Sequence, residues 1–264
     1  MEQVKNTKKI LSNKRPEKSL ILNIGSKAGR NWSGRITVRH RGGGVKRFYR
    51  IIDFSQSKID VEGTVLAIEY DPYRTSYIAL IEYEDKEKKY IIAPQGLNVG
   101  DKVIIKEKAE IKIGNRMRLK NIPVGTMVHN VELESGRGGK IVKSAGSAAI
   151  VLAREGGFIH LSLPSTEVRM VKEDCFASIG SVSNPEHKFE KVGKAGTSRY
   201  MGRRPEVRGL VMNPVDHPHG GGEGRTGIGM PHPKTPWGKN AFGVKTRKRK
   251  KWSNKYIMQR RKKQ

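Results

Sequence analysis

The sequence predicts an all-β protein with two small β modules in the middle of the chain and long basic extensions at both ends. Short segments rich in β-branched and aromatic residues recur between residues 61 and 182 at spacings of about ten residues. No apolar stripe with helical periodicity interrupts them. Charge is sorted along the chain, because the middle is nearly neutral whereas both ends are strongly basic.

The first module is predicted over residues 53–125. Its expected strands are residues 61–70, 76–83, 88–93 and 102–107. They are separated by the turn formers Asp71 and Pro72, by the charged stretch 84–87 and by a turn at residues 98–101. This pattern is typical of a small barrel or sandwich.

The second module is predicted over residues 126–200. Its expected strands are residues 126–133, 148–152, 158–163, 167–171 and 176–182, with glycine-rich turns at 136–139 and 156–157. We interpret it as a second small barrel, linked to the first by residues 121–125. Beyond Asn184 the strand pattern ends, and small residues alternate with basic ones.

Net charge indicates the class of partner. The 264 residues carry a formal charge of +28 at pH 7. Residues 1–52 contain 14 Lys or Arg residues against two acids, and residues 207–264 contain 15 against two. Between them, residues 53–134 have 12 basic and 14 acidic residues, and residues 135–206 have 12 and seven. Solubility alone gives no reason for this sorting, so we expect a globular body with two extensions that bind nucleic acid.

The N-terminal extension, residues 1–52, suits phosphate binding. Residues 18–52 contain nine Lys or Arg residues and no acid, and the triplet Gly42 to Gly44 allows close approach of a backbone. Trp32, Phe48 and Tyr49 are candidates for stacking on unpaired bases. The alternative is that these aromatics anchor the extension to the β body, and for Phe48 we prefer it.

The C-terminal region, residues 201–264, contains the most informative segment, residues 213–225 (NPVDHPHGGGEGR). Two prolines and four glycines forbid an ordinary helix or central strand, and only Val215 suits a core. Such a segment needs an external partner to order it. The tail, residues 245–264, has eleven Lys or Arg residues and no acid, so alone in water we expect it to be disordered.

Other functions were weighed against nucleic-acid binding. His217, His219 and His232, with Asp216 and Glu223, offer metal ligands, but not in the spacing of a helical metal motif. Residues 222–227 match G-x-G-x-x-G without the strand and helix that a nucleotide site requires. Proton transfer by His217 or His219 is less favoured than a hydrogen bond to RNA or backbone. We therefore expect no catalytic residue, no metal and no cofactor.

Localisation signals are weak. Cys175 is the only cysteine, so no intramolecular disulfide is expected, and we predict a buried side chain. The longest apolar run, residues 148–153, is far too short to cross a membrane, and residues 1–11 lack a secretory apolar region. We expect those first residues to form a solvated arm, and we expect no membrane partner.

Several motifs together resemble the large ribosomal subunit protein two family, in its bacterial or organellar form. They lie at residues 34–44 (GRITVRHRGGG), 68–72 (IEYDP), 121–126 (NIPVGT), 203–209 (RRPEVRG), 212–225 and 235–238 (TPWG). The resemblance covers roughly residues 16–264. Departures fall before Pro16 and at Trp32, Tyr73, Ile113, Met117, Arg118 and Thr166, where Thr166 replaces a glycine.

The resemblance implies a fold and a function. The fold is an OB-fold-like barrel, then an SH3-like barrel, with RNA-embedded extensions. The function is that of a non-enzymatic component of the large subunit that binds ribosomal RNA early in assembly and supports subunit association and the peptidyl-transferase region. It also implies neighbouring ribosomal proteins and the small subunit as contacts, and a ribosome in a bacterial cytoplasm, plastid or mitochondrion. A free basic nucleic-acid binder and a metal-dependent enzyme are the alternatives.

The resemblance and the local composition together give the expected RNA-binding residues. They are basic, glycine, polar or aromatic residues of the two extensions, with His217 placed near the peptidyl-transferase region. The set is Arg35, Arg39, His40, Arg41, Gly42, Gly43, Gly44, Lys46, Arg47, Arg50, Arg203, Arg204, Arg208, Asn213, His217, His219, Gly220, Gly221, Gly222, Arg225, Trp237, Arg247, Lys248, Arg249, Lys250, Arg260 and Arg261.

Overall fold

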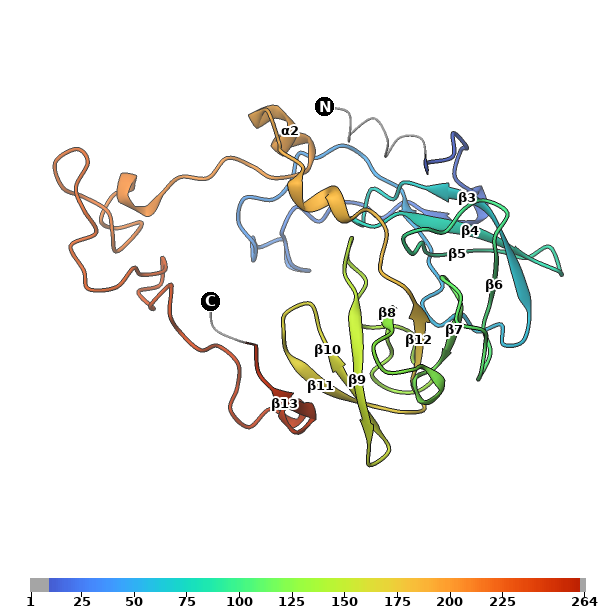
Figure 1. Cartoon of the computed structure of the whole chain (residues 1–264). Helices are drawn as coiled ribbons and strands as arrows, with labels where there is room; N and C mark the ends of the chain where they lie inside the picture. Colours follow the sequence, from blue (N-terminus) through green and yellow to red (C-terminus); the bar gives the residue numbers. More distant parts are fainter. Residues whose placement is uncertain (1–9, 262–264) are drawn as a thin grey trace. The chain divides into compact units, whose positions relative to one another are not determined.

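The computed structural model describes residues 10–261, which fold mainly into short strands (Figure 1). The all-β prediction is confirmed. The expectation for residues 1–11 falls almost wholly outside the described residues. The strands are β1 (Ile21–Leu22), β2 (Tyr49–Arg50), β3 (Glu62–Glu69), β4 (Ile78–Tyr83), β5 (Lys88–Ile92), β6 (Lys102–Ile104), β7 (Arg116–Arg118), β8 (Met127–His129), β9 (Ala149–Glu155), β10 (Phe158–Ser162), β11 (Val168–Lys172), β12 (Phe176–Ile179) and β13 (Ile257–Gln259).

Helical structure is confined to short pieces. One α-helix, α2 (Ala195–Tyr200), and five 3-10 turns occur among the described residues. The turns are η1 (Lys18–Leu20), η2 (Leu119–Asn121), η3 (Pro185–Phe189), η4 (Gly209–Val211) and η5 (Trp252–Tyr256).

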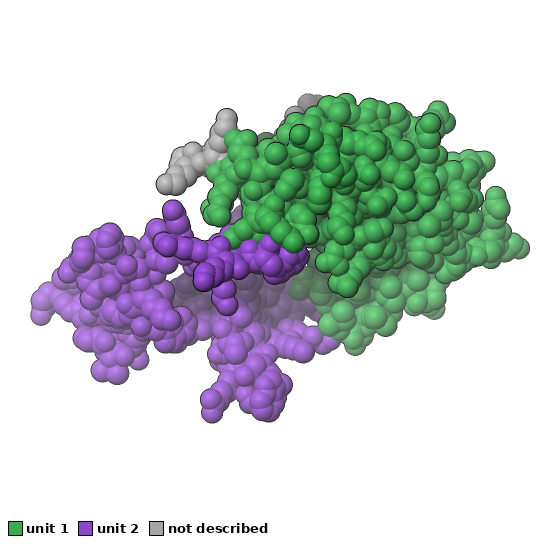
Figure 2. Space-filling view, turned by 90° about the horizontal axis from the view of Figure 1, so that it is seen from below, with its two compact units in different colours: residues 1–24, 47–191, 253–264 green, residues 25–46, 192–252 purple. Residues whose placement is uncertain are grey.

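The chain forms two compact units, coloured separately in Figure 2. Within the described residues, the β unit comprises residues 10–24, 47–191 and 253–261. The extension unit comprises Gly25–Lys46 and Val192–Trp252. Each segment of the extension unit therefore leaves the β unit and returns to it, so that both are closed loops along the chain and neither is a free arm.

The first sheet of the β unit has the strand order β5-β4-β3-β6, with all neighbours antiparallel. Its side chains alternate between two buried clusters, because successive residues of a strand point to opposite faces. Ala79 and Ile81 belong to one cluster, and Ile78 and Leu80 belong to the other. Burial on both faces explains why these strands read as nearly continuous apolar runs.

The chain before β1 packs along the first module. The Ser12 N–H donates to the Ile68 carbonyl at 2.8 Å, and the Glu17 N–H donates to the Tyr90 hydroxyl at 2.9 Å. That hydroxyl in turn donates to Glu69 Oε2 at 2.8 Å. Burial raises the pKa of the Glu69 carboxyl. Residues 10–24, predicted as part of the N-terminal extension, thus contribute to the packed β unit.

The second sheet has the strand order β13-β11-β10-β9-β8-β12-β7 and encloses a core of its own. Leu119, Val128, Ile159 and Leu161 are almost fully buried in it. Cys175 is buried there as predicted, and burial raises the pKa of its thiol to about 11. An unreactive apolar side chain is the role that fits this environment.

The predicted strands are found with shifted ends, and two strands of the second sheet were missed. β7 lies before the predicted link at 121–125, yet it pairs with β12 in the second sheet. β7 was not predicted as a strand because it contains the basic residues Arg116 and Arg118. The burial of Arg116 depends on a partner that is remote in sequence. The link therefore does not separate the two sheets along the chain.

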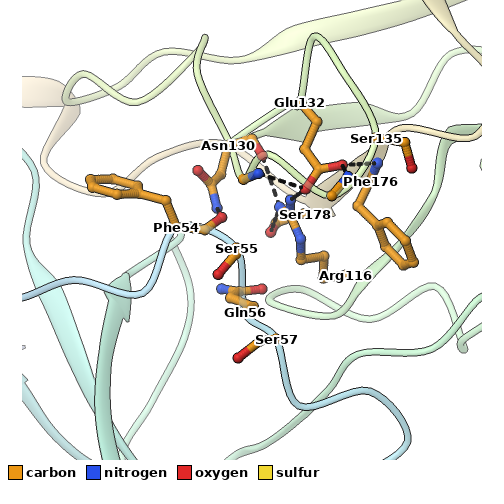
Figure 3. A network of polar contacts seen from close by, with 12 residues as sticks. Phe54, Ser55, Gln56, Ser57, Arg116, Asn130, Glu132, Ser135, Phe176 and Ser178 are labelled. Carbon is orange, nitrogen blue, oxygen red and sulfur yellow. Dashed lines mark hydrogen bonds and ion pairs between the residues drawn. The ribbon is translucent and has the colours of Figure 1, made fainter.

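The buried partner of Arg116 is Glu132, and both side chains are at most 2% exposed (Figure 3). Arg116 Nη2 lies 3.0 Å from Glu132 Oε1, and its Nη1 donates to the Asn130 carbonyl at 2.8 Å. The Glu132 carboxylate also accepts from the backbone N–H groups of Gly136 and Gly138, each at 3.2 Å. Removing one partner of such a pair leaves an uncompensated buried charge, which is strongly destabilising.

The second missed strand, β13, corrects the expectation of a wholly disordered tail. β13 pairs with β11, Ser253 is buried, and the Tyr256 ring lies 6.3 Å from that of Phe158. The tail has enough apolar residues here to dock, although its composition as a whole is highly charged. This short strand covers the edge of β11, which would otherwise offer unpaired backbone groups.

Candidate nucleic-acid interface

The predicted RNA-binding residues divide between the two units. Most lie in the extension unit, whereas Arg47, Arg50, Arg260 and Arg261 lie in the β unit. No α-helix or extended sheet organises the extension unit apart from α2, so its shape depends on turns, glycine contacts and isolated backbone bridges.

The first loop of the extension unit is built from residues 29–38. The backbone N–H groups of Thr37 and Val38 donate to the Gly29 carbonyl at 2.9 and 3.0 Å. Asn31 Oδ1 accepts from the N–H groups of Ser33 and Arg35, both at 3.0 Å. A Cβ at Gly29 would collide with the Val38 carbonyl, so a glycine is needed there. This organised loop presents Trp32, which is 97% exposed.

Two sequence segments meet in the extension unit through backbone contacts. Arg41 and Arg203 form an antiparallel bridge, and the Gly42 N–H donates to the Gly202 carbonyl at 3.0 Å. The Arg204 N–H donates to the His40 carbonyl at 3.1 Å on the other side of that bridge. Basic residues of two motifs, predicted separately from the sequence, therefore line one cleft of about 750 Å³.

Arg199 also lines this cleft and was not among the predicted residues. It lies on α2, between Gly196 and Gly202, in the stretch whose alternation of small and basic residues was visible in the sequence. Arg39 lies at the same cleft, and its guanidinium carbon stands 5.7 Å from the centroid of the Trp237 ring. Trp237 keeps 74% of its surface exposed, so the other face of its ring is accessible for stacking.

The glycine- and histidine-rich loop folds on itself. The His217 N–H donates to the Asn213 carbonyl, and the Gly221 N–H donates to the Met212 carbonyl at 3.1 Å. A Cβ at Gly220 would collide with the carbonyl of Asn213. The triple glycine is thus required partly by close contacts within the loop, in addition to any approach by RNA.

His217 and His219 have structural hydrogen bonds. His217 is 7% exposed, and its Nδ1 accepts from the His219 N–H at 3.0 Å. His219 Nε2 accepts from the Lys234 N–H at 2.8 Å. Each ring therefore uses one nitrogen as an acceptor for a backbone donor, which fixes the tautomer of the neutral ring. The buried His217 ring holds the loop in shape, and Gly209 leaves the space for it.

Arg47, a predicted residue of the β unit, has protein partners. The Arg47 guanidinium lies 4.7 Å from the centroid of the Tyr73 ring and donates to the Pro72 carbonyl at 3.1 Å. Tyr49 packs edge-on against Tyr73 at 5.6 Å, which supports the anchoring interpretation for Tyr49. Phe48, for which anchoring was preferred, is still 42% exposed.

Several other predicted basic residues lie on exposed chain. Arg35, Lys46, Arg208 and Arg225 are exposed, as is the basic run Arg247 to Lys250. Arg260 and Arg261 follow β13 directly and are exposed as well.

Residues 10–261 contain neither a metal-binding cluster nor a membrane-spanning helix. Within that range no group of three or more His, Cys, Asp or Glu side chains has the arrangement needed to hold a metal ion. No helix in the same range is long and apolar enough to cross a membrane.

Comparison with known protein families gives two matches. Residues 17–105 match the family model described as Ribosomal Proteins L2, RNA binding N-terminal domain. Residues 112–238 match the model described as Ribosomal Proteins L2, C-terminal domain. Together the two matches include most of the β unit and of the extension unit.

Proposed function

Because the chain belongs to the ribosomal protein L2 family, it is a ribosomal protein with an RNA-binding N-terminal domain, and we propose that it binds large-subunit ribosomal RNA early in subunit assembly. Large-subunit RNA and other ribosomal proteins are its partners. The observation that supports the proposal best is the Arg-lined extension unit, in which backbone bridges join two glycine-rich basic segments.

The proposed mechanism has a rigid and an adaptable part. The two packed sheets of the β unit provide a platform, and the extension unit provides exposed Arg and Lys side chains for phosphates. Each neutralised phosphate releases counterions, so affinity should fall steeply with salt. Phosphate and backbone contacts would dominate, with base stacking on exposed aromatics such as Trp32 and Trp237.

We further propose roles in subunit association and in supporting the peptidyl-transferase region. The ordered loop around His217 supports a structural role there, because both of its histidines are engaged by backbone donors. We propose that the protein is not an enzyme, has no membrane partner, contacts the small subunit, and works in a bacterial, plastid or mitochondrial ribosome.

Incorporation of variants into large subunits tests this proposal. Arg39→Ala and Arg225→Ala should each reduce incorporation several-fold in competition with the wild type, because each removes a charge-assisted phosphate contact. Lys86→Ala is the matched control, since Lys86 is equally exposed but lies in the turn between β4 and β5. Quantitative mass spectrometry of purified subunits measures the ratio. Equal incorporation of all three variants would refute the proposed RNA-facing role of these motifs.

A further inference from the structure

The Arg-lined cleft of the extension unit combines segments that are about 160 residues apart in sequence. Residues 39–41 form one side, and residues 195–206 form the other. Besides the Arg41–Arg203 bridge, the Val45 N–H donates to the Tyr200 carbonyl at 3.0 Å. A Cβ on Gly44 would stand 3.0 Å from Gly202 Cα, so these backbones are already as close as glycine permits.

The cleft has a large excess of positive charge. Arg39, Arg41, Arg199, Arg203 and Arg204 line it. Glu206 is the only acidic residue among those that line the cleft. Like charges gathered in one concavity repel each other, and a polyanion removes that cost.

The volume of the cleft limits what enters it. About 750 Å³ is in the range that encloses a drug-sized ligand. A few nucleotides of one strand would fill a cleft of this size. Planar guanidinium groups also suit bidentate contacts with successive phosphates.

We infer that the two segments of the extension unit bind RNA as one composite site, which holds consecutive phosphates of a single ribosomal RNA strand. The inference rests on the proposed function and adds to it that the N-terminal and C-terminal glycine-rich basic motifs contact the same RNA segment. Arg199 joins the predicted residues as a phosphate ligand of this site.

Directed hydroxyl-radical probing tests the inference. An iron chelate is attached to His40→Cys or to Ser198→Cys, two positions on opposite sides of the cleft, in the full chain carrying Cys175→Ala. The probe is deproteinised bacterial large-subunit ribosomal RNA. Both positions should cleave the same short RNA segment, and a chelate at Lys86→Cys should cleave elsewhere or not at all.

The possible outcomes separate the inference from the proposed function. Cleavage of two unrelated RNA segments from positions 40 and 198, with binding intact, overturns the composite site but leaves the proposed function standing. Failure of the unlabelled wild-type chain to bind this RNA overturns both.

Affinity measurements on charge variants provide a second test that does not depend on labelling. Arg41→Ala and Arg203→Ala should each weaken RNA binding about tenfold. The loss of affinity in the double variant should be clearly smaller than the product of the two single losses. Glu206→Gln should strengthen binding, because it removes the carboxylate from the cleft. Strictly multiplicative losses, with no effect of Glu206→Gln, would contradict one shared site.

Discussion

At the scale of single residues, Thr166 adopts a backbone conformation that suits glycine better. Its φ is +65°, in the hairpin turn between β10 and β11, where its N–H donates to the Leu163 carbonyl. A β-branched residue is strained in this region. This is also the position where the family resemblance leads one to expect glycine, so the sequence signal and the backbone geometry agree.

Thr166→Gly should therefore stabilise the β unit, by about 0.5–1 kcal/mol after the greater entropy of an unfolded glycine is counted. Urea unfolding followed by circular dichroism measures the change. Ser165→Gly is the neighbouring control, because Ser165 does not have a positive φ, and it should be neutral or destabilising. A lower midpoint for Thr166→Gly than for the control would argue against strain at this turn.

His129 should make stability dependent on pH. Its side chain is 1% exposed on β8, with Nδ1 2.9 Å from the Gly180 carbonyl, and burial lowers its pKa from 6.5 to about 4. Between these values the unfolded chain takes up a proton that the native chain does not, so stability falls as the pH falls. We expect a loss of about 2 kcal/mol between pH 7.5 and pH 5 from this residue.

The comparison of wild type with His129→Asn isolates this contribution, since Asn can donate a similar hydrogen bond but does not titrate. The unfolding free energy should fall between pH 7.5 and pH 5 in both proteins, and this fall should be about 2 kcal/mol smaller in the variant than in the wild type. The acidic residues titrate in both proteins and cancel in the difference. An identical pH dependence in the two proteins would show that His129 is not buried in its neutral form.

From the sequence, candidate site residues could be proposed one by one, but not their spatial neighbours. Composition and motif were enough to select Arg41 and Arg203, because basic residues beside glycine suit phosphates. Their pairing depends on a backbone bridge between remote segments, which no local pattern encodes. The burial of His217 could likewise not be predicted from the sequence, since it results from the folding of its own loop around Gly209 and Gly220.

At the scale of elements, strand prediction succeeded where apolar residues are dense. β4 and β5 are buried on both faces and their positions follow from composition alone. β7 and β13 were missed, because Arg116 needs Glu132 to be buried, and β13 needs the edge of β11 to pair with. Such tertiary partners override the local preference of a short segment.

The docking of β13 leads to a prediction about the C-terminal tail. Ile257→Pro removes a backbone donor from a strand that pairs with β11, so the tail should be released from the β unit. Amides of β11 should then exchange faster with solvent, and trypsin should cleave the tail sooner. Hydrogen exchange and limited proteolysis measure the two effects.

A proline in the loop before the tail strand serves as the control for that experiment. Thr246→Pro lies in exposed chain that belongs to no described strand or helix, and it should leave both measurements unchanged. If the β11 amides exchange as slowly in the Ile257→Pro variant as in the wild type, the edge of the second sheet does not depend on the tail.

At the scale of the whole molecule, the basic excess lies largely on chain that is closed at both ends. Gly25–Lys46 and Val192–Trp252 each begin and end at the β unit, and the docking of β13 closes the second of them. A closed loop loses less conformational entropy on binding than a free arm of equal length. The fold therefore holds these basic segments partly ordered before any partner is bound.

We propose that these segments embed the protein in the large subunit through ribosomal RNA. The most direct test is sedimentation of a native lysate through a high-salt gradient, with detection of this chain. We predict that the chain stays with the large ribosomal subunit after the salt wash, because shape and backbone contacts add to the screened charges. Its release to the top of the gradient, with the subunit otherwise intact, would contradict this proposal and favour a free basic nucleic-acid binder.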